Sequence, residues 1–156
     1  MRFRDQRILD IAAASGAHST TGVPTTLDSP AVPEALGHAL AEQLRQYQPT
    51  AVVFWSSCEA SVLCHVVARE LGVDILPAYD DLGRLSLGRH PENGAAIVAV
   101  DVEWADYPGV LPLLRTVAGA GGTVVAVGTV LYTPPADAAA GVPLHVLEPA
   151  GAGGAA

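Results

Sequence analysis

Two apolar segments, joined by an amphipathic one, constrain the fold of this chain more than any other feature. The first is AIVAV at 96–100 and the second is GTVVAVGTVL at 122–131, and neither alternates regularly with polar residues. Strands of this kind are typical of a parallel sheet that helices cover on both faces. The segment between them, 109–118, carries apolar residues at helical spacing: Val110, Leu111, Leu114 and Val117. The region therefore predicts a strand, a helix and a second, parallel strand.

Strand and helix signals alternate along the rest of the chain as well. Helices are expected at 1–14, 29–48 and 58–72, strands at 51–55, 73–78 and 143–147, and a β-ribbon at the RLSL of 84–87. This alternation predicts an α/β fold with a single doubly wound, mostly parallel sheet. We expect the strands near 51–55, 73–78, 96–101 and 123–131 to be neighbours. One domain would span 1–148, followed by a flexible tail, EPAGAGGAA, whose last eight residues are 149–156.

The charge of the chain excludes some partners. Its net charge is −8, it has no lysine, and its eight basic residues are all arginine. A nucleic-acid binder needs a basic face, so no nucleic-acid partner is expected. The apolar stretch ILDIAAASGA is too short to cross a bilayer, so no membrane partner is expected; it suits a first helix, with a weak signal peptide as the alternative. Two cysteines six residues apart on one helix favour buried thiols and a cytoplasmic location.

The order of these segments resembles the type I phosphoribosyltransferases. The resemblance covers roughly residues 30–132: a helix, then AVVFWSSCEASVLCHVVARELGV, a polar ribbon, and AIVAVDVEWADYPGVLPLLRTVAGAGGTVVAVGTVL. It implies the fold of that family and a homodimer. It also implies that acids at the end of the 96–100 strand hold the ribose of phosphoribosyl pyrophosphate, and that a Thr-Thr-Gly-type loop cradles its 5′-phosphate.

The residues that define this activity are replaced in the present chain. Asp101 matches the first acid of the family motif, but Val102 stands where the second acid belongs. Ala105, Asp106 and Tyr107 stand where Thr, Thr and Gly belong. The loop has therefore lost the hydroxyls and the glycine that let N–H groups converge on an anion.

Two further segments supply candidate ligand-binding residues through the resemblance. The pyrophosphate-side loop contributes Ser56, Ser57, Cys58 and Glu59, and the ribbon contributes Arg84. Cys58 opens a helix, whereas Cys64 and His65 are adjacent and diverge, so a shared metal site is not expected there.

The acidic loop from Asp101 to Gly109 can also be interpreted without the family resemblance. If the chain stays extended, Asp101 and Glu103 face the same way and could act as a catalytic pair, or hold Mg²⁺ or a polyol. Trp104 and Tyr107, with Trp55 as a further candidate, could instead cage an amine. Asp106 and Gly109 would also line the site. The plainer alternative is a solvated acidic loop whose aromatic side chains pack over the sheet edge.

Two functional classes remain open. The sequence favours a divergent phosphoribosyltransferase-like protein that has lost ordinary phosphoribosyl pyrophosphate chemistry. Such a protein would bind a nucleoside, sugar, amine or partner protein at the carboxyl edge of the sheet. The alternative is an enzyme, either an active phosphoribosyltransferase or one repurposed for another nucleoside or sugar phosphate.

Overall fold

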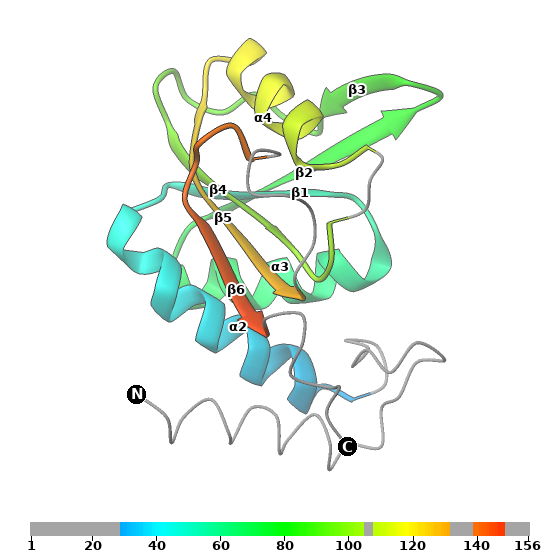
Figure 1. Ribbon diagram of the computed structural model, residues 1–156. Helices are drawn as coiled ribbons and strands as arrows, with labels where there is room; N and C mark the ends of the chain where they lie inside the picture. The colour runs from blue at the N-terminus through cyan, green and yellow to red at the C-terminus, as the bar shows by residue number, and fades with distance from the viewer. Residues whose placement is uncertain (1–28, 105–107, 132–138, 149–156) are drawn as a thin grey trace.

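The computed structural model describes residues 29–104, 108–131 and 139–148 (Figure 1). The predicted helix at 1–14, the loop residues 105–107 and the tail at 149–156 lie outside these ranges. None of the helices in the three ranges is both long enough and apolar enough to cross a membrane.

The described strands form one six-stranded sheet in the order β3-β2-β1-β4-β5-β6. All neighbouring pairs are parallel except β2 and β3, so the sheet is mostly parallel, as predicted. The four strands expected to be neighbours are neighbours. The strand bounds are β1 Ala51–Trp55, β2 Asp74–Asp81, β3 Arg84–Leu87, β4 Ala96–Asp101, β5 Thr123–Leu131 and β6 Leu144–Glu148.

Helices cover both faces of the sheet, which confirms the doubly wound architecture. Figure 1 shows α2 and α3 on one face and α4 on the other. The helix bounds are α2 Ala31–Leu44, the short 3₁₀ helix η1 Arg45–Tyr47, α3 Cys58–Leu71 and α4 Val110–Gly119. Gly72 ends α3 in the left-handed conformation (φ 71°), as the sequence predicted.

Two apolar cores hold these layers together, and strand β4 contributes to both. Val98 and Val100 lie in the core under α2 and α3, whereas Ile97 and Ala99 lie in the core that includes Leu113 of α4. Successive side chains of a strand point to opposite faces, so a continuously apolar strand is buried on both sides. Each fully buried valine or isoleucine stabilises the fold by about 1.5–3 kcal/mol relative to its exposed state.

Strand β2 ends three residues later than the sequence indicated, because it continues into an antiparallel ribbon with β3. Tyr79, Asp80 and Asp81 pair with Ser86, Leu85 and Arg84 in that order. Leu82 and Gly83 form the turn with φ values of 51° and 86°, and the Gly83 N–H donates to Asp80 Oδ1 at 2.7 Å. The predicted ribbon is confirmed, and Asp80 lies on its first strand, two residues beyond Ala78, which pairs with Trp55 at the end of β1.

Candidate ligand-binding pocket

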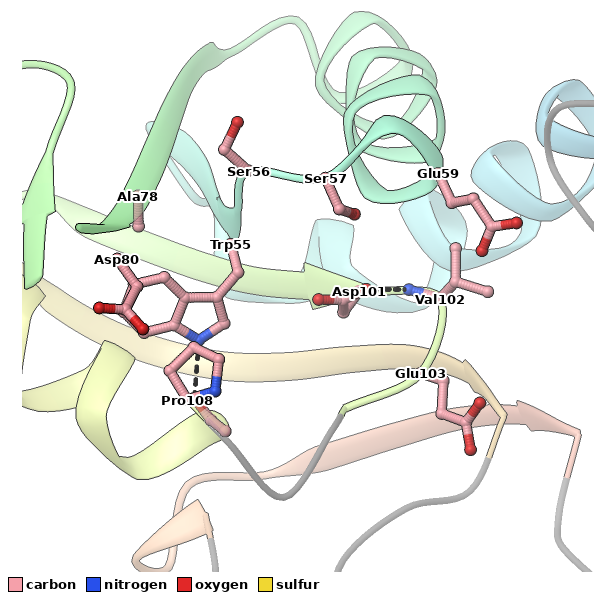
Figure 2. Close-up of a pocket in the computed structure, with 11 residues that line it drawn as sticks. Trp55, Ser56, Ser57, Glu59, Ala78, Asp80, Asp101, Val102, Glu103 and Pro108 are labelled. Carbon is pink, nitrogen blue, oxygen red and sulfur yellow. Dashed lines mark hydrogen bonds between the residues drawn. The ribbon is translucent and has the colours of Figure 1, made fainter. Parts of the chain in front are cut away.

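A pocket of about 420 Å³ lies at the carboxyl ends of the parallel strands. In open α/β sheets this edge is where ligands bind. Three segments form its wall: the loop after β1, the end of β2, and the loop between β4 and α4 (Figure 2). The described residues that line it are Trp55, Ser56, Ser57, Glu59, Ala78, Asp80, Asp101, Val102, Glu103, Pro108 and Gly109.

The loop after β1 is short and ends in a well-formed helix start. Ser57 has extended backbone angles, and its Oγ accepts the Ala60 N–H at 3.2 Å, which satisfies one N–H of the first turn of α3. Ser56, Ser57 and Glu59 line the pocket, as predicted, but Cys58 does not. The Cys58 side chain is exposed, whereas Cys64 is buried, so the expectation of two buried thiols is half right.

Asp101 is the last residue of β4 and has an unusual environment for a carboxyl group. Its Oδ1 accepts the Val102 N–H at 2.7 Å. Burial raises its pKa from 3.8 to about 7. The N–H groups of Val102 and Glu103 act in the opposite direction, while the negative charges of Glu59 and Glu103 add to the rise. Asp101 is therefore partly protonated near neutral pH.

Val102, which the resemblance sets at the position of the second ribose-binding acid, is a core residue. Its side chain is 3% exposed and belongs to the core under α2 and α3. Its carbonyl accepts the N–H groups of Val130 and Leu131 at 3.2 and 3.0 Å, and the Thr129 hydroxyl at 3.1 Å. The start of the loop is thus fixed to the end of β5, with Val102 directed inward.

The residues after Val102 do not continue the strand, which overturns two predictions. Because the chain bends there, Asp101 and Glu103 do not face the same way, and Figure 2 shows their side chains pointing in different directions. Trp104 is 2% exposed and packs in the core beside α4, so the prediction that it lines the site is wrong. Mg²⁺ at Asp101 and Glu103 stays a prediction that this geometry does not favour. Among the described residues, no three His, Cys, Asp or Glu side chains are grouped as a metal site.

Of the aromatic candidates, Trp55 is the one that lines the pocket among the described residues. It is the last residue of β1, and its Nε1–H donates to the Gly109 carbonyl at 2.8 Å. Gly109 precedes α4 with φ 70° and ψ −177°, a conformation that only glycine adopts readily. Among the described residues no side chain caps α4, and Pro112 in its first turn has no N–H to offer an anion. Gly109 lines the pocket as predicted, and Pro108 does so in addition.

The ribbon contributes an acid to the pocket instead of the predicted base. Arg84 is exposed on β3 and is not among the lining residues, whereas Asp80 is. Arg89 pairs with Asp74 at 2.7 Å, at the opposite end of β2. Among the described lining residues there are four carboxylates and no basic side chain. The predicted ligand-binding residues Asp106 and Tyr107 lie outside the described ranges.

Comparison with known proteins shows which fold the chain has. No family model matches the sequence, and a search of curated proteins finds no match. The chain is similar to solved structures of phosphoribosyltransferases. A phosphoribosyltransferase from Corynebacterium diphtheriae is 19% identical with a TM-score of 0.74, the match covering 92% of this chain and 96% of that one.

Two other solved structures have the same architecture. Orotate phosphoribosyltransferase of Mycobacterium tuberculosis, in complex with 5-phospho-alpha-D-ribosyl 1-diphosphate, is 16% identical with a TM-score of 0.73, covering 96% of each chain. Adenine phosphoribosyltransferase from Thermoanaerobacter pseudethanolicus is 16% identical with a TM-score of 0.66, covering 80% of this chain and 84% of that one. The chain therefore has the type I phosphoribosyltransferase fold, as the resemblance implied.

Proposed function

We propose that this protein binds a small molecule that carries hydroxyl or amine groups, and that it has lost ordinary transfer from phosphoribosyl pyrophosphate. One observation carries the proposal: the pocket is lined by Glu59, Asp80, Asp101 and Glu103, with no basic side chain among its described lining residues. A site of this charge favours a neutral or positively charged ligand over a phosphate.

Electrostatics argues against a phosphate in this pocket. A unit charge of the same sign at about 4 Å, with an effective dielectric of about 20, costs roughly 4 kcal/mol. The donors that would offset this cost are few. The Val102 N–H is bonded to Asp101, and Pro112 removes one N–H from the start of α4. Positions 105–107, where the family has Thr, Thr and Gly, read Ala, Asp and Tyr.

The size and the polar groups of the pocket favour a small molecule over a partner protein. Its volume of about 420 Å³ lies within the usual range of small-ligand sites. Ser56 and Ser57 offer hydroxyls that can donate or accept, as sugar and nucleoside hydroxyls require. The ring of Trp55 adds an apolar wall that also suits a cation.

A thermal-shift panel tests this proposal with spermidine, adenosine, ribose, and phosphoribosyl pyrophosphate with and without Mg²⁺. We expect spermidine or a hydroxyl-rich compound to raise the melting temperature, since ligand binding stabilises the folded state by mass action. The enzymatic alternative, an active phosphoribosyltransferase or an enzyme for another nucleoside or sugar phosphate, predicts stabilisation by the phosphate compounds. That outcome would overturn the proposal.

A pair of variants on the ribbon locates the binding. Asp80→Asn removes a pocket charge but keeps an oxygen that can accept the Gly83 N–H. We expect it to weaken spermidine binding about fivefold, which corresponds to roughly 1 kcal/mol of lost attraction. Asp81→Asn is the matched control, because Asp81 is exposed on the same strand and does not line the pocket. Equal losses of spermidine affinity in the two variants would show that spermidine does not bind in the pocket.

We also propose that the chain self-associates, as expected from the sequence. In the described ranges, the large apolar side chains with the most exposure include Leu82, fully exposed at the ribbon tip, and Tyr79, at 44% exposure on β2. Exposed apolar side chains of this kind suit an interface. Light scattering at tens of micromolar should give the mass of a dimer, and a strict monomer would exclude it.

A further inference from the structure

Trp55 connects two parts of the pocket that are far apart in the sequence. It ends β1, it is 8% exposed, and it lines the pocket. Its indole N–H donates to the carbonyl of Gly109, 54 residues further along, at 2.8 Å and in a buried position. Figure 2 shows this bond beside Pro108, on the opposite side of the pocket from Glu103.

The bond matters because the two ends of the loop between β4 and α4 are held differently. The first end is fixed by the Val102 carbonyl, which accepts three hydrogen bonds from the end of β5. At the second end, Gly109 is the N-cap of α4 and has no side chain to cap it, and a glycine backbone can adopt several alternative conformations. Within the described residues, the hydrogen bond from the Trp55 side chain holds that end of the loop.

We propose that Trp55 is the positioning residue of the pocket: it holds Pro108 and Gly109 against the end of β1, and so sets the pocket's width and keeps water from Asp101. The effect on ligand affinity rests on the proposed function, but the effect on the loop and on Asp101 does not.

The hydrogen bond to Gly109 also limits how Trp55 can contact a ligand. Its single donor is used by Gly109, so the side chain offers only its ring to the pocket. If the bond is lost, the Gly109 carbonyl keeps only its hydrogen bond within the first turn of α4, and the link between that end of the loop and the end of β1 is broken. A wider, wetter pocket would hydrate Asp101, whose environment also includes Glu59, Glu103 and the buried Cys64.

Two replacements of Trp55 in the full chain test the proposal. Trp55→Phe removes the N–H together with part of the ring. Replacement of Trp55 by β-(3-benzothienyl)alanine, with sulfur in place of N–H, removes the donor with almost no change of shape. If the phenylalanine variant is poorly folded, this second replacement tests the role of the hydrogen bond. Tyr47→Phe is the matched control, because it removes another 2.8 Å hydrogen bond, to His145, away from the lining residues of the pocket.

Two ligand-free measurements give the result. Carboxyl-carbon NMR should show the titration midpoint of Asp101 falling by at least one pH unit from about 7 in both Trp55 replacements. Amide hydrogen exchange at Leu113 and Leu114, the first amides of α4 with a helical acceptor, should become at least tenfold faster relative to exchange in β4. Tyr47→Phe should change neither. A residue that only stabilised the fold would lower the unfolding midpoint and leave the Asp101 midpoint in place, and that result would overturn the proposal.

Calorimetry with spermidine separates this proposal from the proposed function. We expect binding to weaken at least threefold in both Trp55 replacements and to be unchanged in Tyr47→Phe. If spermidine does not bind the unaltered protein, the amine form of the proposed function fails, while the Asp101 titration and the exchange rates still decide the role of Trp55.

Discussion

The loop after β1 consists of Ser56 and Ser57, whereas the loop after the neighbouring strand β4 runs from Val102 to Gly109. In the short loop, Ser57 caps the helix that follows it, and the Ser56 N–H donates to the Ala78 carbonyl of β2 at 2.8 Å. The long loop depends on other elements, with Val102 held by the end of β5 and Gly109 held by Trp55 of β1. Both lie at the same edge of the sheet and both line the pocket.

The difference explains how the fold and the chemistry of a family can separate. The fold depends on apolar strands and helices, which the chain keeps. The resemblance implies a phosphate site in a loop that exposes hydroxyls and N–H groups; here Val102 and Trp104 of that loop are buried, and positions 105–107 read Ala, Asp and Tyr. Changes in the long loop should therefore have larger effects than equivalent changes in the short one.

The largest effect is expected from Val102→Asp, which restores the second acid of the family motif. A carboxylate at a position that is 3% exposed enters the core beside Val100 and Val130. Urea unfolding should show a loss of about 3 kcal/mol, since an unpaired charge would be buried. Val62→Asp is the control, because Val62 is 37% exposed and should change stability by no more than about 0.5 kcal/mol. A stable Val102→Asp protein that gains pyrophosphate binding would show that the loop readily adopts the family's geometry.

Gly109→Ala should cost about 1–3 kcal/mol, because φ 70° with ψ −177° is strained for any residue with a Cβ atom. Gly119→Ala, at the other end of α4, provides the comparison. Nothing lies within 4 Å of a Cβ atom there and φ is not positive, so stability should stay the same or rise slightly. Equal losses in the two variants would mean that the start of α4 is not under conformational constraint.

Asp101 should make stability fall as the pH rises from about 4 to about 7. Its pKa is raised from 3.8 to about 7 by burial, so over that range the folded state holds a proton that the unfolded state has released. The slope from this one group is at most about 1.4 kcal/mol per pH unit. Asp101→Asn should remove this component from the pH profile of chemical unfolding. An identical profile for the variant would contradict the burial of Asp101.

The smallest effect is expected in the short loop, from Ser57→Ala. Losing the bond from Ser57 Oγ to the Ala60 N–H should cost about 1 kcal/mol, the usual value for a helix cap. Ser56→Ala, at the exposed neighbouring position, should be close to neutral. If Ser57→Ala costs more than Gly109→Ala, the comparison between the loops is reversed.

Most of the fold could be predicted because burial on both faces leaves a direct mark on the sequence. The apolar runs of β4 and β5, and the spacing of the helices, predict neighbouring parallel strands without any knowledge of the loops. The end of β2 was placed too early, because Tyr79, Asp80 and Asp81 are polar and their pairing with β3 depends on a partner strand rather than on burial.

The site was less predictable, because side-chain directions in a loop follow no period. Alternation stops at Asp101, so nothing in the sequence showed that Trp104 turns into the core or that Glu103 diverges from Asp101. Asp80 was missed for a different reason: it lies two residues beyond the predicted end of β2, where the sequence predicts only a polar connection to the ribbon. The predicted adjacency of β1 and β2 would have placed Asp80 at the same edge as Trp55.

The central claim is that the pocket rejects the phosphate substrate of its fold relatives. Calorimetric titration of the full chain with phosphoribosyl pyrophosphate and Mg²⁺, at low ionic strength, tests it most directly. We expect binding weaker than about 1 mM, and no loss of affinity in Asp101→Asn, because four acidic side chains line the pocket and the hydroxyls of the family's phosphate loop are absent from the sequence. Micromolar, magnesium-dependent binding that Asp101→Asn abolishes would contradict the claim, and it would show that the loop still serves the chemistry of the family.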